Sequence, residues 1–132
     1  MKIVINKCYG GFSLSHKAIM RYAELKGITL YPEIDEITIR VAKELGNSPP
    51  TFDNAYMVHY HTKEDMHEEN YWSDYDIDRT DTALIQVVEE LGEDANGSCA
   101  NLQIIEIPDG VNWELDEYDG LESIHETHRS WS

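Results

Sequence analysis

The sequence has little of what holds a protein in a membrane or cross-links it outside the cell. Only two of its 132 residues are cysteines, too few for the disulfide framework of a small secreted domain, which favours a reduced intracellular setting. No apolar run approaches the ~20 residues that a membrane-spanning helix needs. Residues 1–6 turn polar too soon for a secretory signal, so we expect the mature chain to begin at Met1 and to reside in the cytoplasm.

Basic residues are also scarce. The chain has 10 Lys and Arg against 26 Asp and Glu, a net charge of −16 at pH 7. Residues 1–66 hold eight of each sign, whereas residues 67–132 hold two basic and eighteen acidic residues and no lysine. Without clustered basic side chains, direct binding to nucleic acid or to an anionic membrane is disfavoured. Two interpretations stay open: an acidic face that binds a basic protein surface, or an acidic surface that only keeps the protein soluble.

Length and composition predict one folded domain, because 132 residues fit a single domain and 41% hydrophobic residues suffice for a core. Short β-branched runs at residues 2–8 and 28–31 flank a helical pattern over residues 13–27. A strand, a helix and a strand with short joints predict a βαβ unit with parallel strands. The expected fold class is α/β: one small domain over residues 1–132, with a mixed sheet of about five or six strands and two or three helices.

The middle of the chain is less uniform. Residues 35–45 fit both helical and strand spacing, and the ending at residues 42–46 favours the helix. Segment 63–78 is acidic, contains aromatic residues and has few aliphatic ones, so we predict that it is mobile. Three clearer elements are a strand at residues 56–61, an amphipathic helix at residues 81–91 after the N-cap Asp81, and a central strand at residues 102–107.

The last third predicts a β-hairpin. Asp119-Gly120 is a strong signal for a two-residue type I′ turn, in which both residues take positive φ. That turn pairs Leu115 with Ile124 and places both on the face of Trp113, which we expect to be the buried one. The same register sets Glu114 opposite His125 on the other face. The alternative is a helix over residues 121–128.

The segment between the first strand and the first helix is a candidate binding loop. A glycine pair before a helix N-terminus can present backbone N–H groups to an anion. It matches neither a P-loop nor a dinucleotide fingerprint, and two glycines can also serve only a sharp turn. The residues that would bind a small, nucleotide-like anion are Asn6, Lys7, Gly10, Gly11, Phe12, Ser13 and Ser15, with Arg129 from the end of the chain.

Catalytic and metal-binding patterns are incomplete. Cys8 lies beside the glycine loop with His16 as the histidine nearest in sequence, but a buried structural thiol is the favoured interpretation. His59 and His61 share one face of a predicted strand and His67 follows, yet no established metal-site spacing is met. We therefore assign no catalytic residue, no metal ligand and no cofactor, and binding is favoured over catalysis.

Aromatic residues in acidic surroundings form a candidate interface, because such rings are enriched at interaction hot spots. Packing of the segment onto the protein's own body is the alternative. The residues concerned are Tyr71, Trp72 and Tyr75, together with Trp131 near the C-terminus.

Several stretches resemble a family of small uncharacterised proteins encoded by tailed phages and large DNA viruses. The opening is INKCYGGFSLS at residues 5–15, and the middle blocks are residues 81–91 and 105–113. The close is EYDGLE at residues 117–122 and HRSW at residues 128–131. The resemblance covers about half the chain and implies a viral origin, hence the host cell's cytoplasm, but no established activity.

Three functions follow from these observations. The first is a virus-encoded acidic accessory protein that binds a host or viral macromolecule through a basic protein surface, without catalysis. The second is a small-ligand binder that uses the Gly10-Gly11 loop. The third is a small enzyme centred on Cys8 or on His59 and His61. The sequence does not identify the partner, and self-association into a homo-oligomer is also possible.

Overall fold

The computed structural model of the protein describes residues 1–52, 57–97 and 100–126 and shows a small α/β domain, as predicted. The helices and strands, in chain order, are β1 Lys2–Asn6, α1 His16–Lys26, β2 Tyr31–Ile34, α2 Glu36–Glu44, β3 Val58–His61, β4 Tyr71–Trp72, α3 Thr82–Leu91, β5 Leu102–Glu106, β6 Trp113–Tyr118 and β7 Leu121–Glu126. Three short 3₁₀ helices lie at Glu68–Asn70, Asp74–Asp76 and Gly92–Ala95.

The strands form three antiparallel sheets in the described part of the chain, in the orders β1-β5, β2-β3-β4 and β6-β7. The prediction of one mixed sheet with a parallel βαβ start is therefore wrong. β1 pairs with β5, with Val4 opposite Ile104, whereas β2 pairs with β3. The physical reason lies in β2 itself: it is short and half-exposed and contains Pro32, which lacks an N–H donor and suits an edge strand.

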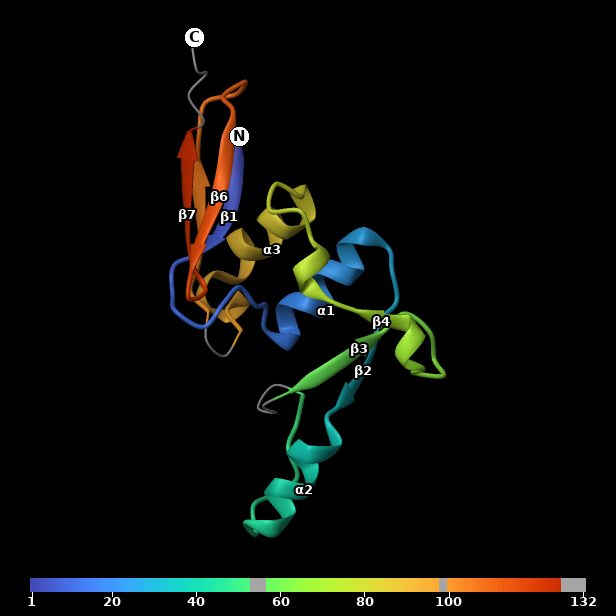
Figure 1. The fold of residues 1–132 in the computed structure, drawn as a ribbon. Helices are drawn as coiled ribbons and strands as arrows, with labels where there is room; N and C mark the ends of the chain where they lie inside the picture. The colour runs from blue at the N-terminus through green and yellow to red at the C-terminus, as the bar shows by residue number, and fades with distance from the viewer. Residues whose placement is uncertain (53–56, 98–99, 127–132) are drawn as a thin grey trace.

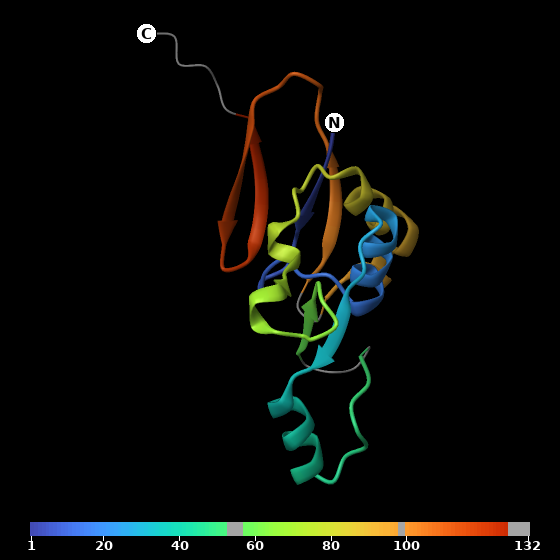
Figure 2. The ribbon, with the colours of Figure 1, turned by 90° about the vertical axis from the view of Figure 1, so that its right-hand side faces the viewer.

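The strands and helices are arranged in layers. Figure 2 shows the β6–β7 hairpin on one side, β1 and β5 in the middle, and α1 and α3 on the other side. α1 packs against α3, and α3 packs against β1 and β5. The sheet β2-β3-β4 and helix α2 extend away from this body (Figure 1). The core therefore lies between the two helices and the β1–β5 pair.

Local signals account for the ends of α1 and α3. The Ser15 hydroxyl accepts from the Ala18 amide to cap α1, and Gly27 ends it in the left-handed conformation at φ 70°. The Asp81 carboxylate accepts from the Ala83 and Leu84 amides at the start of α3. The apolar stripe of α3 is buried as predicted: Ala83, Leu84, Val87 and Val88.

The C-terminal hairpin is confirmed in register and turn. Leu115 lies opposite Ile124, and Asp119 and Gly120 have φ of 53° and 87°. The face of Trp113, Leu115 and Ile124 is half-buried, as expected for the inner face. His125 lies opposite Glu114, but its Nε2 contacts Asp116 Oδ2 at 3.0 Å. The alternative helix over residues 121–128 is wrong for its described part.

Helix α2 is confirmed, but its apolar residues are exposed. Asp35 caps it by accepting from the Ile37 amide at 2.9 Å. Ile37 and Leu45 are 59% and 70% exposed, because α2 projects from the body of the molecule (Figure 1). The spacing of apolar residues thus predicted the helix correctly, but it did not indicate that these residues are buried.

Segment 63–78 forms β4 and two of the 3₁₀ helices, and Trp72 within it packs against the core. Its mobility remains a prediction. No helix in the described ranges combines the length and apolar character needed to cross a membrane.

Candidate functional site

The glycine pair of the predicted binding loop receives the turn of the hairpin. The Gly10 amide donates to the Asp119 carbonyl at 3.0 Å. A Cβ atom on Gly120 would overlap the Gly11 amide nitrogen and lie 2.7 Å from that of Gly10. The two turns therefore touch backbone to backbone, which requires glycine at position 120, while Gly10 and Gly11 have positive φ of 120° and 100°.

Asn6 joins three separated segments at this contact. Its side-chain Nδ2 donates to the Gly120 and Cys8 carbonyls, both at 2.7 Å, and its Oδ1 accepts from the Asn101 amide at 2.9 Å. Its backbone amide donates to Glu122 Oε1 at 2.8 Å. A fully buried Asn whose side-chain amide and backbone N–H are all hydrogen-bonded has a structural role, and Cys8 nearby is a free, half-buried thiol.

A buried ion pair that no sequence motif indicates lies beneath this loop. The Arg79 guanidinium bonds both carboxylate oxygens of Glu122, with Nη2 to Oε2 at 2.8 Å, and also donates to the Val4 carbonyl. It lies 3.7 Å from the centroid of the Phe12 ring. Glu122 is only 2% exposed. One signal could have indicated it: Arg79 is one of only two basic residues in the acidic half of the sequence.

The other predicted loop residues divide into two groups. Lys7 is exposed, and its amide donates to the Asn101 carbonyl at 2.8 Å. Ser13 and Ser15 line a cleft. Arg129 lies outside the described residues. Binding of an anion by this loop remains a prediction, while the Gly10 amide is already engaged by the hairpin.

That cleft has a volume of about 530 Å³ and is a second candidate site. It lies between β3, β4 and the start of α1, and it joins the predicted binding loop to the predicted aromatic interface. Its polar and aromatic lining includes Ser13, Ser15, His16, Phe52, His59, Tyr60, Tyr71, Trp72, Ser73 and Asp74.

Two histidines in the cleft are held by neighbours. His59 Nε2 lies 2.8 Å from Asp35 Oδ1, and the ring stacks on Tyr71 with centroids 5.6 Å apart. The hydrogen bond with His59 lowers the pKa of the Asp35 carboxyl below its ordinary value. His16 Nδ1 lies 2.8 Å from the Tyr60 hydroxyl. Of the two, His59 is oriented by a carboxylate, and an imidazole held in this way can transfer a proton.

The aromatic residues differ in exposure. Tyr71 and Tyr75 are 55% and 69% exposed, consistent with a contact surface. Trp72 is half-buried and meets Tyr60 edge to face at an interplanar angle of 78°. Trp131 lies outside the described residues. Trp72 therefore combines local packing with a place in the cleft wall.

Asp74 places a carboxylate in the cleft. Its Oδ2 accepts from the Leu14 amide at 2.9 Å. Burial raises the pKa of the Asp74 carboxyl, although the Leu14 amide and the charge of Arg79 act in the opposite direction. Within the described ranges no Lys or Arg forms an ion pair with it, and the nearby Arg79 bonds Glu122 instead.

The remaining histidines do not assemble a metal centre with these groups. His61 is 1% exposed, has no hydrogen bond on either ring nitrogen within the described chain, and contacts the Tyr71 ring at 4.9 Å between centroids. His67 lies on the exposed turn before β4, beside Glu69. No group of three metal-ligating side chains is found among the described residues.

Comparisons of the chain with models of protein families, with curated proteins and with solved structures gave no match.

Proposed function

We propose that this protein is a virus-encoded acidic accessory protein that binds a basic surface of a host or viral protein, without catalysis. The observation that supports it is the β6–β7 hairpin. Its 14 residues from 113 to 126 contain six carboxylates and no Lys or Arg. Five of those carboxylates are exposed: Glu114, Asp116, Glu117, Asp119 and Glu126.

The viral origin in this proposal is supported by the resemblance of the opening and closing stretches. In the structure, residues from those two stretches meet: Asn6 and Gly10 bond the turn at Asp119 and Gly120. The two stretches that resemble the viral family are therefore also the two stretches that contact each other in the fold.

The experiment is a titration with a lysine-rich peptide over a series of salt concentrations. An acidic face predicts binding at low salt that weakens steadily as the salt concentration rises, because exposed charges are screened. Affinity that is independent of salt, or no binding at low salt, would overturn the proposal.

Two charge-reversal variants of the hairpin, compared with one on α2, test whether the hairpin is the surface that binds the basic peptide. Glu114→Lys and Glu117→Lys alter exposed positions of the hairpin, and Glu36→Lys makes the same charge change on α2. Each hairpin variant should weaken binding more than Glu36→Lys. Equal losses in all three would place the interaction elsewhere or make it a property of the net charge alone.

The His59–Asp35 pair favours a second candidate function, acid–base catalysis in the cleft. A 2.8 Å contact holds the imidazole in one orientation, as a general base requires. The test is a panel of hydrolysis and isomerisation assays on the wild type and on His59→Gln. Turnover that His59→Gln abolishes would establish the enzyme, and turnover unchanged in that variant would reject His59 as the base.

A further inference from the structure

We propose that the cleft between β3, β4 and the start of α1 receives a single arginine side chain of the basic partner. The inference rests on the proposed function and adds the place and the chemistry of recognition. Two features of the cleft carry it: a half-buried carboxylate and a set of aromatic walls.

The carboxylate is that of Asp74. It lines the cleft and is half-buried, and no basic residue of the described chain forms an ion pair with it. A partly desolvated carboxylate gains most from a charged donor that can form hydrogen bonds with it. A guanidinium supplies such donors in a planar fork.

Aromatic rings supply the walls. Tyr60 and Trp72 form a corner at 78°, and Phe52 stacks on His16, whose ring lies against Tyr60. The faces of such rings attract a guanidinium, which packs flat against them. The cleft's volume of about 530 Å³ is within the range of small-molecule sites, so a side chain fits.

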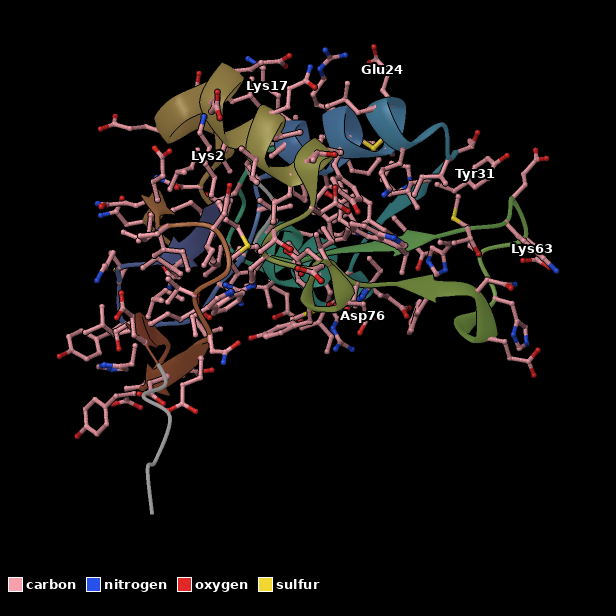
Figure 3. The ribbon with its side chains drawn as sticks, turned by 90° about the horizontal axis from the view of Figure 1, so that it is seen from above. Lys2, Lys17, Glu24, Tyr31, Lys63 and Asp76 are labelled. Carbon is pink, nitrogen blue, oxygen red and sulfur yellow. The ribbon has the colours of Figure 1, made fainter. Side chains whose placement is uncertain are left out.

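The lining also argues against an anion. Among the described residues that line it there is no Lys or Arg, and its two histidines already contact Tyr60 and Asp35. The labelled Lys17 points away from the body on the outer side of α1, and Lys63 lies at the far end of the β3–β4 strands (Figure 3). The charge that the cleft offers is therefore negative.

The chain itself shows the same recognition chemistry in another place. Arg79 lies over the Phe12 ring and bonds the carboxylate of Glu122. A carboxylate beside an aromatic ring thus binds a guanidinium within this fold, and the cleft is lined by the same two kinds of group.

The test is a double-mutant cycle with two peptides. One is lysine-rich with a single central arginine, and the other replaces that arginine by citrulline, which has nearly the same shape but no charge. Wild type, Asp74→Asn and Glu114→Gln are titrated with both by calorimetry at low salt. Glu114→Gln is the matched control, because it makes the same charge change on the hairpin.

For wild type and Glu114→Gln we expect the arginine peptide to bind about tenfold more tightly than the citrulline peptide, the range of a hydrogen bond to a charged group. For Asp74→Asn the two peptides should bind alike. An arginine preference that persists in Asp74→Asn would overturn the cleft proposal while leaving the basic-partner proposal intact. Failure of both peptides to bind wild type would overturn both.

Phe52→Leu gives an independent reading, since Phe52 lines the cleft against His16 and is 38% exposed, so its replacement does not open the core. It should reduce the arginine preference without changing affinity for the citrulline peptide. If Asp74→Asn does not fold, as judged by circular dichroism, this variant decides: an unchanged preference rejects the cleft.

Discussion

Gly120 is the residue that allows the hairpin turn to pack against the Gly10-Gly11 loop. Its φ of 87° is in the left-handed region, and the position of its missing Cβ is occupied by the Gly10 and Gly11 backbone. Gly110 has a similar φ of 81°, but nothing lies within 4 Å of its missing Cβ. Comparing alanine substitutions at Gly120 and Gly110 therefore separates the free-energy cost of the left-handed backbone from the cost of the steric overlap.

Gly120→Ala should therefore destabilise the protein by more than about 3 kcal/mol, since strain and backbone overlap add. Gly110→Ala should cost only about 1–2 kcal/mol, the price of a left-handed alanine. Urea unfolding measures both. Equal losses in the two variants would mean that the contact between the turns contributes nothing.

Tyr22 gives the protein a specific response to high pH. Its hydroxyl donates to Asp81 Oδ2 at 2.9 Å, and burial, followed by that bond, raises the pKa of Tyr22 to about 12. Between pH 10, the ordinary value, and about 12, the folded protein retains a proton that the unfolded chain loses. The free energy of unfolding must fall as pH rises through this window.

Tyr22→Phe should remove this part of the pH dependence and cost about 1 kcal/mol at neutral pH through the lost hydrogen bond. Unfolding curves at pH 7, 10 and 11.5, compared with wild type, give both quantities. A variant whose stability falls as steeply as that of wild type above pH 10 would show that Tyr22 is not the source.

At the level of elements, the hairpin is held to the body by a buried ion pair. Glu122 of β7 bonds Arg79, which precedes α3, and also accepts from the Asn6 amide of β1. A buried charge that loses its partner is costly, whereas apolar replacement of both partners is often tolerated. The three elements are therefore coupled through one carboxylate.

Glu122→Leu should cost about 3–5 kcal/mol, because it leaves the Arg79 guanidinium buried without a counter-charge. The double variant Arg79→Met with Glu122→Leu should recover much of that loss. Thermal or urea unfolding of the three variants forms the cycle. A double variant no more stable than Glu122→Leu alone would mean that the pair contributes through more than its charge.

At the scale of the whole molecule, charge repulsion opposes the folded state. The net charge of −16 is concentrated in the second half of the chain, and the hairpin presents five exposed carboxylates. Such self-repulsion destabilises a compact state and is screened by salt.

The midpoint of thermal unfolding should therefore rise by about 3–6 °C between about 10 and 300 mM NaCl, which corresponds to ~1 kcal/mol at this size. A variant with Glu114, Asp116 and Glu117 changed to the corresponding amides should start higher and rise less. A midpoint that is constant or falls over this range would contradict the prediction.

Local patterns predicted much of the fold because their physics acts over a few residues. The turn at Asp119-Gly120 sets the register of the strands on both sides, and the cap at Asp81 with the stripe after it sets α3. The candidate site was predicted only in pieces: Ser13, Ser15, Tyr71 and Trp72 were named for separate reasons. Their meeting in one cleft, and the presence of Asp74 there, depend on contacts between distant segments.

The sequence by itself determined the helices, the hairpin and the acidic character, since periodicity, capping and charge are properties of neighbouring residues. Only the tertiary structure decided that β1 pairs with β5 instead of β2, and that the glycine pair receives a turn more than 100 residues away. It also decided that Arg79 meets Glu122. The physical reason is that a strand or a buried charge takes the partner that best completes its burial and hydrogen bonding, and that choice is made among all surfaces of the folded chain at once.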